Sequence, residues 1–317
     1  MAPTITGIGD INTLLYTTQF TANMEMLLQQ TASVLRSLVM TGSHVGKMAS
    51  PVNQIAPFAY SAPSGRYNTL NKTDIQFDRR WVFPQPKEFM TLLDDFDLLQ
   101  TIVDPKGPIA QSAVAAANRA FDDAIIAAAL GTAQVGEDAA SLTAETFDTT
   151  DYQVVDTFGA SAACGLTVAK LNEARRMLLH NHAFDVKPED RLVLVVGSQQ
   201  QSDLYNLATV VSSDFSAAYA PEFDDKKRVT RFMGFDIVTS ERLNTASSST
   251  IRKCFAFVSS GMYLGMWLDH SVNITQRYDL SSQPVQFYSK LMFGATRLMQ
   301  GKVIEVDCLD STGADNI

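Results

Sequence analysis

The sequence has few cysteines, a shortage of positive charge and no long hydrophobic run, and each shortage excludes a class of protein. Its 317 residues include three cysteines, far apart in the chain, which is typical of reduced thiols rather than of a disulfide framework. Lys and Arg total 25 against 34 Asp and Glu, and a net charge of −9 is unsuited to coating nucleic acid through its phosphates. The longest apolar run, residues 124–130, is far too short to cross a membrane.

The first sixty residues carry only four charges, and the first positive one is Arg36. A basic segment that would begin a secretory signal is therefore missing, and so is the polarity of a solvated tail. Within this arm, six apolar residues keep helical spacing: Phe20, Met24, Leu27, Leu28, Leu35 and Leu38. The spacing predicts an amphipathic helix. Its apolar stripe packs either on the body of its own chain or on a neighbouring subunit, and the sequence leaves both open.

Residues 40–90 hold five of the eleven prolines, and short β-type runs lie between them. This pattern predicts an extended, two-stranded excursion rather than a compact domain. Such a segment cannot bury its own faces, so it is expected to lie on another surface.

An alanine-rich helix is predicted over residues 109–130, with Pro108 in its first turn and Gly131 at its end. A second helix is predicted to start after Thr167 as its N-cap. The apolar run 191–196 indicates a buried strand in a mixed α/β region. Residues 285–298 and 303–308 are predicted to form a β-hairpin around Gln300 and Gly301.

The sequence contains no convincing motif for catalysis, metal binding or cofactor binding. Residues 42–47 resemble a phosphate loop but have one residue too few between the glycines, and Met48 stands where Ser or Thr is needed. His180 and His182 are two apart, so on a helix they point to different sides. Cys164 has no evident histidine partner, and an inert buried thiol is the better interpretation. We therefore expect no catalytic, cofactor or metal residues.

Several stretches, taken in order and spacing, are similar to one known family. They are Arg79-Arg80, residues 92–99 and 102–105, 118–133, 165–176, 232–238, 293–297 and 302–307. Together they cover nearly the whole chain, although none is diagnostic alone. The chain resembles the major capsid (coat) protein of tailed double-stranded DNA bacteriophages, of the Hong Kong 97 fold.

The resemblance implies an α+β fold with an N-terminal arm, an extended β-hairpin loop, a peripheral domain with a long spine helix, and an axial domain. The implied map is arm 1–39, extended loop 40–91, peripheral domain 92–165 with spine helix 108–131, axial domain 166–270, and peripheral return strands and C-terminus 271–317. The resemblance implies that the chain is not an enzyme. It implies self-assembly as pentamers and hexamers into an icosahedral head, which encloses double-stranded DNA without binding it specifically.

The resemblance also implies other head proteins as partners. They are a portal, with decoration proteins as a further option. A separate scaffolding protein, or none, is implied, because no scaffold segment is expected on this chain. Assembly in the bacterial host cytoplasm and a final place in the virion follow, with no membrane partner.

The residues expected at contacts between subunits are Phe20, Met24, Leu27, Leu28, Arg79, Arg80, Trp81, Phe83, Arg297 and Glu305; packing within one chain is the alternative for each. Arg297 and Glu305 are expected on facing strands, paired within one chain or between chains. Two other functions stay open: an encapsulin-like cellular shell protein that stores cargo enzymes, and a soluble α/β enzyme whose site assembles in space.

Overall fold

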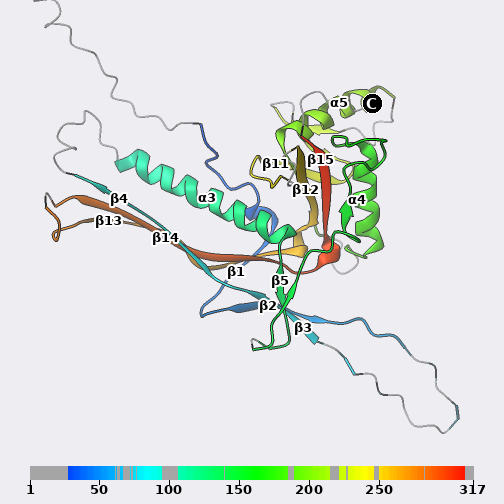
Figure 1. The fold of residues 1–317 in the computed structure, drawn as a ribbon, viewed down its shortest axis with the longest axis horizontal. Helices are drawn as coiled ribbons and strands as arrows, with labels where there is room; N and C mark the ends of the chain where they lie inside the picture. The colour runs from blue at the N-terminus through cyan, green and yellow to red at the C-terminus, as the bar shows by residue number, and fades with distance from the viewer. Residues whose placement is uncertain are drawn as a thin grey trace, which may run out of the picture.

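Three β-sheets and one long helix carry the fold in this computed structural model (Figure 1). The structure describes residues 28–60, 62, 65, 66, 72, 74, 75, 77–94, 106–138, 140–184, 189–214, 221–225, 228–245, 250–281 and 283–310. One buried apolar cluster extends from the long helix α3 (Lys106–Leu130) into the largest sheet, so these parts share a core.

The largest sheet has seven strands in the order β7-β15-β12-β8-β11-β10-β9. They are β7 (Gln153–Val154), β8 (Leu192–Val196), β9 (Glu222–Phe223), β10 (Val229–Phe232), β11 (Phe235–Thr239), β12 (Ile251–Val258) and β15 (Val303–Leu309). All five residues of the central strand β8 are buried, as an uninterrupted apolar run predicts. Helices α4 (Val168–His180) and α5 (Ser198–Asp214) lie beside the sheet (Figure 1), and the hydroxyl of Thr167 caps α4 as predicted.

A second sheet has the strand order β1-β13-β14-β4 and reaches far from the first (Figure 1). Its strands are β1 (Met40–Ser43), β4 (Gln85–Leu93), β13 (Met262–Gln276) and β14 (Val285–Arg297). Helix α3 runs along one face, where the rings of Phe121 and Phe293 meet edge to face with centroids 4.8 Å apart. The predicted alanine-rich helix is confirmed, with a start three residues earlier than expected.

The third sheet is small and has the order β2-β3-β5-β6. Strands β2 (Ala49–Ile55) and β3 (Phe77–Val82) are the two sides of the excursion that the prolines predict, and they pair antiparallel. Strands β5 (Ala133–Val135) and β6 (Thr143–Glu145) follow α3 and hold the root of this hairpin through the β3–β5 pairing. The excursion leaves the body on the side opposite α3 (Figure 1).

The predicted helix in the arm is wrong over its described part. From residue 28 onward the structure has only the short 3-10 turn η1 (Arg36–Leu38), followed by β1. The backbone amides of Val34 and Leu35 donate to the carboxylate of Asp122 on α3 instead of to helical carbonyls. The apolar spacing of Leu35 and Leu38 reflects packing against the body of the same chain.

The predicted C-terminal hairpin is also wrong. Both runs are strands, but β14 pairs with β13 and β4 whereas β15 pairs with β12 and β7 in the other sheet. The glycine turn is the 3-10 element η4 (Gln300–Lys302), which carries the chain from one sheet to the other. A second such element, η3 (Ser259–Gly261), makes the same passage between β12 and β13. Arg297 and Glu305 therefore do not lie on facing strands.

Candidate interaction surface

The described residues hold no group of three His, Cys, Asp or Glu side chains that could bind a metal ion. No helix among them is long and apolar enough to span a membrane. All three cysteines are free and buried. The candidate sites among the described residues are a charged cavity, exposed apolar surfaces and several buried charge clusters.

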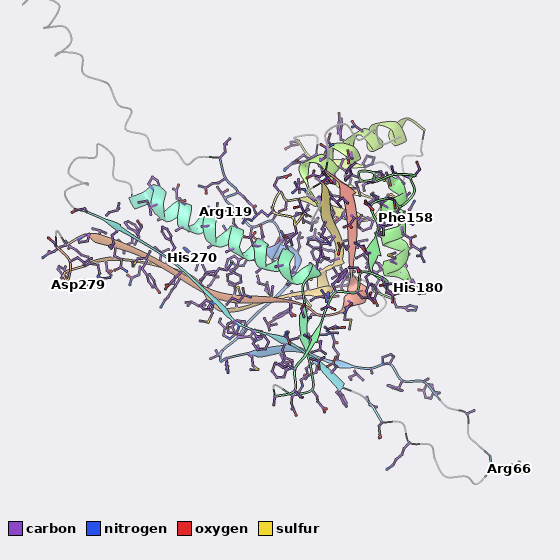
Figure 2. All side chains as sticks on the ribbon, viewed as in Figure 1. Arg66, Arg119, Phe158, His180, His270 and Asp279 are labelled. Atoms are coloured by element: carbon purple, nitrogen blue, oxygen red, sulfur yellow. The ribbon has the colours of Figure 1, made fainter. Side chains whose placement is uncertain are left out.

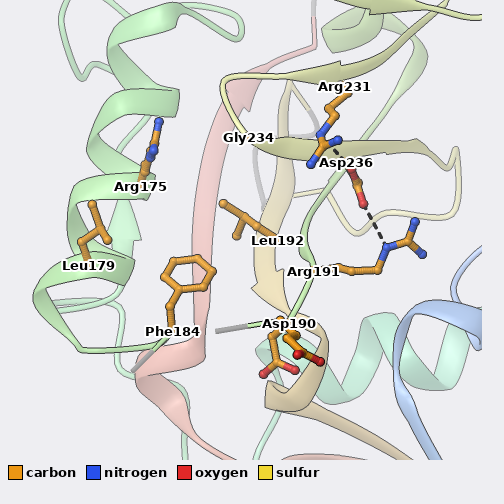
Figure 3. A pocket seen from close by; sticks show the side chains of 10 residues that line it. Arg175, Leu179, Phe184, Asp190, Arg191, Leu192, Arg231, Gly234 and Asp236 are labelled. Carbon is orange, nitrogen blue, oxygen red and sulfur yellow. Dashed lines mark ion pairs between the residues drawn. The ribbon is translucent and has the colours of Figure 1, made fainter. Parts of the chain in front are cut away.

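A cavity of about 600 Å³ lies between α4, the start of β8 and the β10–β11 turn (Figure 3). The carboxylate of Asp236 lies between two guanidinium groups, 3.3 Å from Arg191 and 3.5 Å from Arg231. From α4, Arg175 donates to the carbonyl of Met233 at 3.4 Å. Among the described residues, the lining offers paired Arg and carboxylate charges and contains no Ser, Thr, Cys or His.

The β2–β3 hairpin exposes an apolar face. Ile55 and Phe77 are cross-strand partners, so they point to the same side, and they are 61% and 57% exposed. Beyond the strand ends Phe58, Tyr60 and Ile75 are exposed as well. Large apolar side chains exposed together on paired strands are typical of an interaction surface.

The far end of the long sheet is a second exposed apolar surface. In the edge strand β4, Phe89, Met90 and Leu92 are exposed. Figure 2 shows Asp279 at the tip between β13 and β14, remote from α4 and His180. There Tyr278 is 74% exposed on a turn that two hydrogen bonds from Arg277 to Asp279, of 2.7 and 2.6 Å, hold in shape.

Some expected contact residues lie in the arm and in β3. Phe20, Met24 and Leu27 lie outside the described residues. Leu28 is fully exposed, and Arg79 is also exposed.

Phe83, which follows β3, is half-buried, and the other two candidates, both in β3, have partners in their own chain. Arg80 is buried and forms an ion pair with Glu145 of β6. Burial lowers the pKa of Arg80, and the charge of Asp78 opposes this shift. The half-buried Trp81 donates from its indole nitrogen to the carbonyl of Gly136 at 2.8 Å.

Arg297 is fully buried where α3 ends. Its guanidinium donates to the carbonyls of Ala129 and Gly131, both at 2.8 Å, and lies 5.0 Å from the ring centroid of Phe147. A cation is favourable there because the carbonyls at a helix C-terminus carry partial negative charge. Burial and, to a smaller extent, the positive charge of Arg80 lower the pKa of Arg297 to about 10.

Glu305 is buried in β15 and forms an ion pair with Lys253 at 2.5 Å. Asp307 lies on the same face, and the amide of Gln153 donates to both carboxylates, at 2.9 Å to Asp307 and 3.3 Å to Glu305. Burial and the charge of Glu305 raise the pKa of Asp307 to about 7. Burial alone would lower the pKa of Lys253, but its hydrogen bond to Glu305 and the neighbouring carboxylates raise it.

Sequence reasoning missed a polar clasp on α3. The fully buried carboxylate of Asp122 accepts hydrogen bonds from the backbone amides of Val34 and Leu35, at 3.1 and 3.2 Å, and from the side chains of Ser33 and Gln30. These four donors fix the root of the arm to the middle of the long helix. The sequence did contain a signal for this clasp. Asp122 lies three, four and seven residues before apolar positions of the predicted helix, so a carboxylate shares its apolar face.

Two neighbours of Asp122 extend the clasp. Arg119, labelled on α3 in Figure 2, donates to the backbone carbonyl of Gln30 at 2.9 Å. The next residue, Asp123, forms a two-pronged ion pair with Arg242, which lies just after β11. One turn of α3 thus contacts both the arm and the segment that follows β11.

A family model described as phage capsid protein matches residues 12–310. No curated protein matches the sequence.

Solved structures share the fold at low sequence identity. The capsid structure of cyanophage P-SCSP1u is 16% identical with a TM-score of 0.68, and the match covers 97% of this chain and 96% of that one. The cyanophage Pam1 capsid asymmetric unit is 12% identical with a TM-score of 0.67 over 100% of both chains. The capsid of Ralstonia phage GP4 is 10% identical with a TM-score of 0.63, covering 99% of this chain and 100% of that one.

Proposed function

The chain belongs to the phage capsid protein family and is a structural shell protein of a phage head, and we propose that its copies assemble as pentamers and hexamers into a closed icosahedral shell. Its fold is the Hong Kong 97-type capsid fold of the solved structures it matches. We propose that the shell encloses double-stranded DNA without binding it specifically, since the chain is acidic and would not hold phosphates tightly.

One observation carries the proposal: the β2–β3 hairpin pairs in register from Val52 to Ile55, yet the described residues leave the side chains of Ile55 and Phe77 exposed. The exposed pair Ile55 and Phe77 lies on a two-stranded segment that could not be stable alone in water. A neighbouring copy that covers this face supplies the missing burial. In a symmetric shell every copy both donates and receives such a contact.

The domain map implied by the resemblance is kept as a proposal with one change. The arm is 1–39, the extended loop 40–91, the peripheral domain 92–165 and the axial domain 166–270, with the chain returning to the peripheral domain after 270. Strand β15 belongs to the seven-stranded sheet, so we assign residues 303–309 to the axial domain.

Contacts between copies are proposed for the exposed members of the predicted set, Leu28 and Arg79, together with Phe77 and Tyr278. Arg80, Arg297 and Glu305 have partners in their own chain, so their proposed role is to hold the surfaces that meet. A portal, a scaffolding protein and decoration proteins are further proposed partners. We propose that assembly takes place in the host cytoplasm and involves no catalysis by this chain.

The test is the mass and shape of the purified full-length chain, measured by light scattering and negative-stain microscopy. Closed shells, or free pentamers and hexamers, are the expected result. A chain that stays monomeric both alone and when co-expressed with the other head proteins of its phage would contradict the proposal. Shells that contain a protein cargo and no DNA after co-expression would favour the encapsulin-like alternative.

A further inference from the structure

Three glycines lie in one row across the long sheet. Gly42 of β1 is the cross-strand partner of Gly265 of β13, and Gly265 is the partner of Gly294 of β14. Cross-strand partners point to the same face of a sheet, so the row leaves a side-chain-free trough on one face. The neighbouring Phe293 faces α3 through its contact with Phe121, so the trough lies on the face away from α3.

The link between the extended loop and the long sheet fills one end of this trough. A methyl group on Gly294 would lie 2.9 Å from Cγ1 of Val82 and closer still to the carbonyl oxygen of Phe83, distances that real side chains do not adopt. Phe83 and Pro84 are the only residues between β3 and β4, which belong to different sheets. Proline and the residue before it have little backbone freedom, so the direction of this link depends on where it is seated.

Aromatic side chains fill the other end. A methyl group on Gly265 would lie 3.0 Å from the Trp267 ring and 3.2 Å from the His44 ring. At Gly42 the nearest atom to an added methyl is the phenol oxygen of Tyr263, which also makes a 2.6 Å hydrogen bond with His44. The glycines therefore allow these rings to lie close to the sheet, where they form a wall beside the trough.

Both strands of the hairpin rest against this wall. Val82 of β3 is buried with Tyr263 and Leu298, and Val52 of β2 packs on the same cluster. The side-chain amide of Gln54 in β2 also donates to the carbonyl of Leu298 at 2.8 Å. Two strands and the link that follows them are thus fixed on one surface that glycines make accessible.

We propose that Gly294, Gly265 and Gly42 are positioning residues that set the direction in which the β2–β3 hairpin leaves the body. The effect of this direction on assembly rests on the proposed function, because a hairpin that points elsewhere would not reach the neighbouring copy. The direction itself is a property of the single subunit and can be measured without a shell.

The experiment compares Gly294→Ala with Gly107→Ala, a control at a glycine with no atom near an added methyl. Spin labels on Ala56→Cys in the hairpin and Asn172→Cys on α4 report the distance between hairpin and body in dissociated subunits by pulsed electron resonance. The three native thiols are buried, so labelling is directed to the added ones. Particle yield is measured separately by microscopy on unlabelled chains.

Gly294→Ala is expected to shift the label distance by several ångströms while thermal unfolding stays cooperative, and to lower the yield of closed particles about tenfold or more. Gly107→Ala is expected to leave both unchanged. An unshifted distance in folded Gly294→Ala would overturn the proposal whatever the yield. If the unsubstituted chain forms no particles, either alone or co-expressed with the other head proteins of its phage, but Gly294→Ala still shifts the distance, the proposed function fails and the positioning role stands.

A second pair of variants tests the proposal if Gly294→Ala does not fold. Gly42→Ala is expected to shift the label distance, and adding Tyr263→Phe is expected to restore it, because that change removes the oxygen nearest the new methyl. The distance in Tyr263→Phe alone is expected to match the unsubstituted chain. A Gly42→Ala chain with an unchanged distance, or one that Tyr263→Phe does not restore, would count against the trough as the determinant of direction.

Discussion

The strands β8 and β4 show how differently one chain treats its two main sheets. Every residue of β8 is buried among strands and helices of its own chain, whereas the first six residues of β4 are exposed along a sheet edge. Buried apolar area is the main source of folding free energy, so the seven-stranded sheet stabilises the subunit. The exposed hairpin and β4 leave apolar area that association can still bury. Stability and assembly are therefore expected to depend on different residues.

The largest effect on stability is expected from a substitution in the seven-stranded sheet. Phe255→Ala removes a fully buried ring that packs against Phe257 with centroids 5.7 Å apart. Loss of transfer free energy and the resulting cavity should lower the free energy of unfolding by about 3–5 kcal/mol. Denaturant unfolding of dissociated subunits measures it. The contrast between the two regions fails if Phe255→Ala unfolds at the same denaturant concentration as the unsubstituted chain.

The clasp on α3 should give the next largest effect. Asp122→Ala leaves two backbone amides and two side-chain donors without their acceptor, which should cost about 2–3 kcal/mol and release the arm to faster proteolysis. Asp123→Ala is the matched control, since its ion pair with Arg242 is partly exposed and should be worth less than about 1 kcal/mol. Equal protease sensitivity of the two variants would show that Asp122 does not hold the arm.

Sequence reasoning succeeded where the pattern is local and failed where partners are remote. The helix α3, the cap Thr167 and the buried strand β8 follow from alanine content, capping chemistry and an apolar run. The pairing partners of β14 and β15 do not follow from the sequence, because the residue pattern of a strand does not specify which strand it pairs with. A glycine turn between two strands indicates a hairpin, yet here η4 joins two sheets.

The candidate site shows the same limit. Spacing placed Leu35 and Leu38 on a helix, but the acceptor that replaces helical carbonyls is Asp122, almost ninety residues away. Arg297 was predicted at a contact between subunits and paired with Glu305, with packing within one chain as the alternative, but its partners are the carbonyls of Ala129 and Gly131 at the end of a different element. Backbone acceptors have no signature in sequence, so such contacts emerge only from the fold.

The carboxylate pair in β15 offers a test by pH. Asp307 has a folded pKa of about 7, well above the usual value of 3.8 for an aspartate, so the folded chain keeps a proton that the unfolded chain loses. The free energy of unfolding should therefore fall as pH rises from about 4 through 7, and above that range it should fall no further on account of Asp307. Asp307→Asn should remove this fall and gain about 1–2 kcal/mol at pH 8 after allowance for solvent screening.

The control for this pH effect is Asp279→Asn at the tip of the long sheet. The hydrogen bond from Arg277 lowers the pKa of Asp279 to about 2, so its contribution is lost only in acid. Unfolding curves between pH 5 and 8 should therefore keep the slope of the unsubstituted chain. A slope that persists in Asp307→Asn would assign the titration to another group.

The smallest effect on stability is expected on the hairpin, where the effect on assembly should be large. Phe77→Ala removes a ring that is 57% exposed, so the free energy of unfolding should change by no more than about 0.5 kcal/mol. Truncating an apolar side chain at a covered interface costs about 1–2 kcal/mol or more per contact, and a shell repeats that contact in every copy. The yield of closed particles should therefore fall steeply, while Phe77→Leu, which keeps most of the apolar area, should assemble. A Phe77→Ala chain that forms shells at the normal yield would show that this face of the hairpin is not where copies meet, and would shift attention to Tyr278 at the tip of the long sheet.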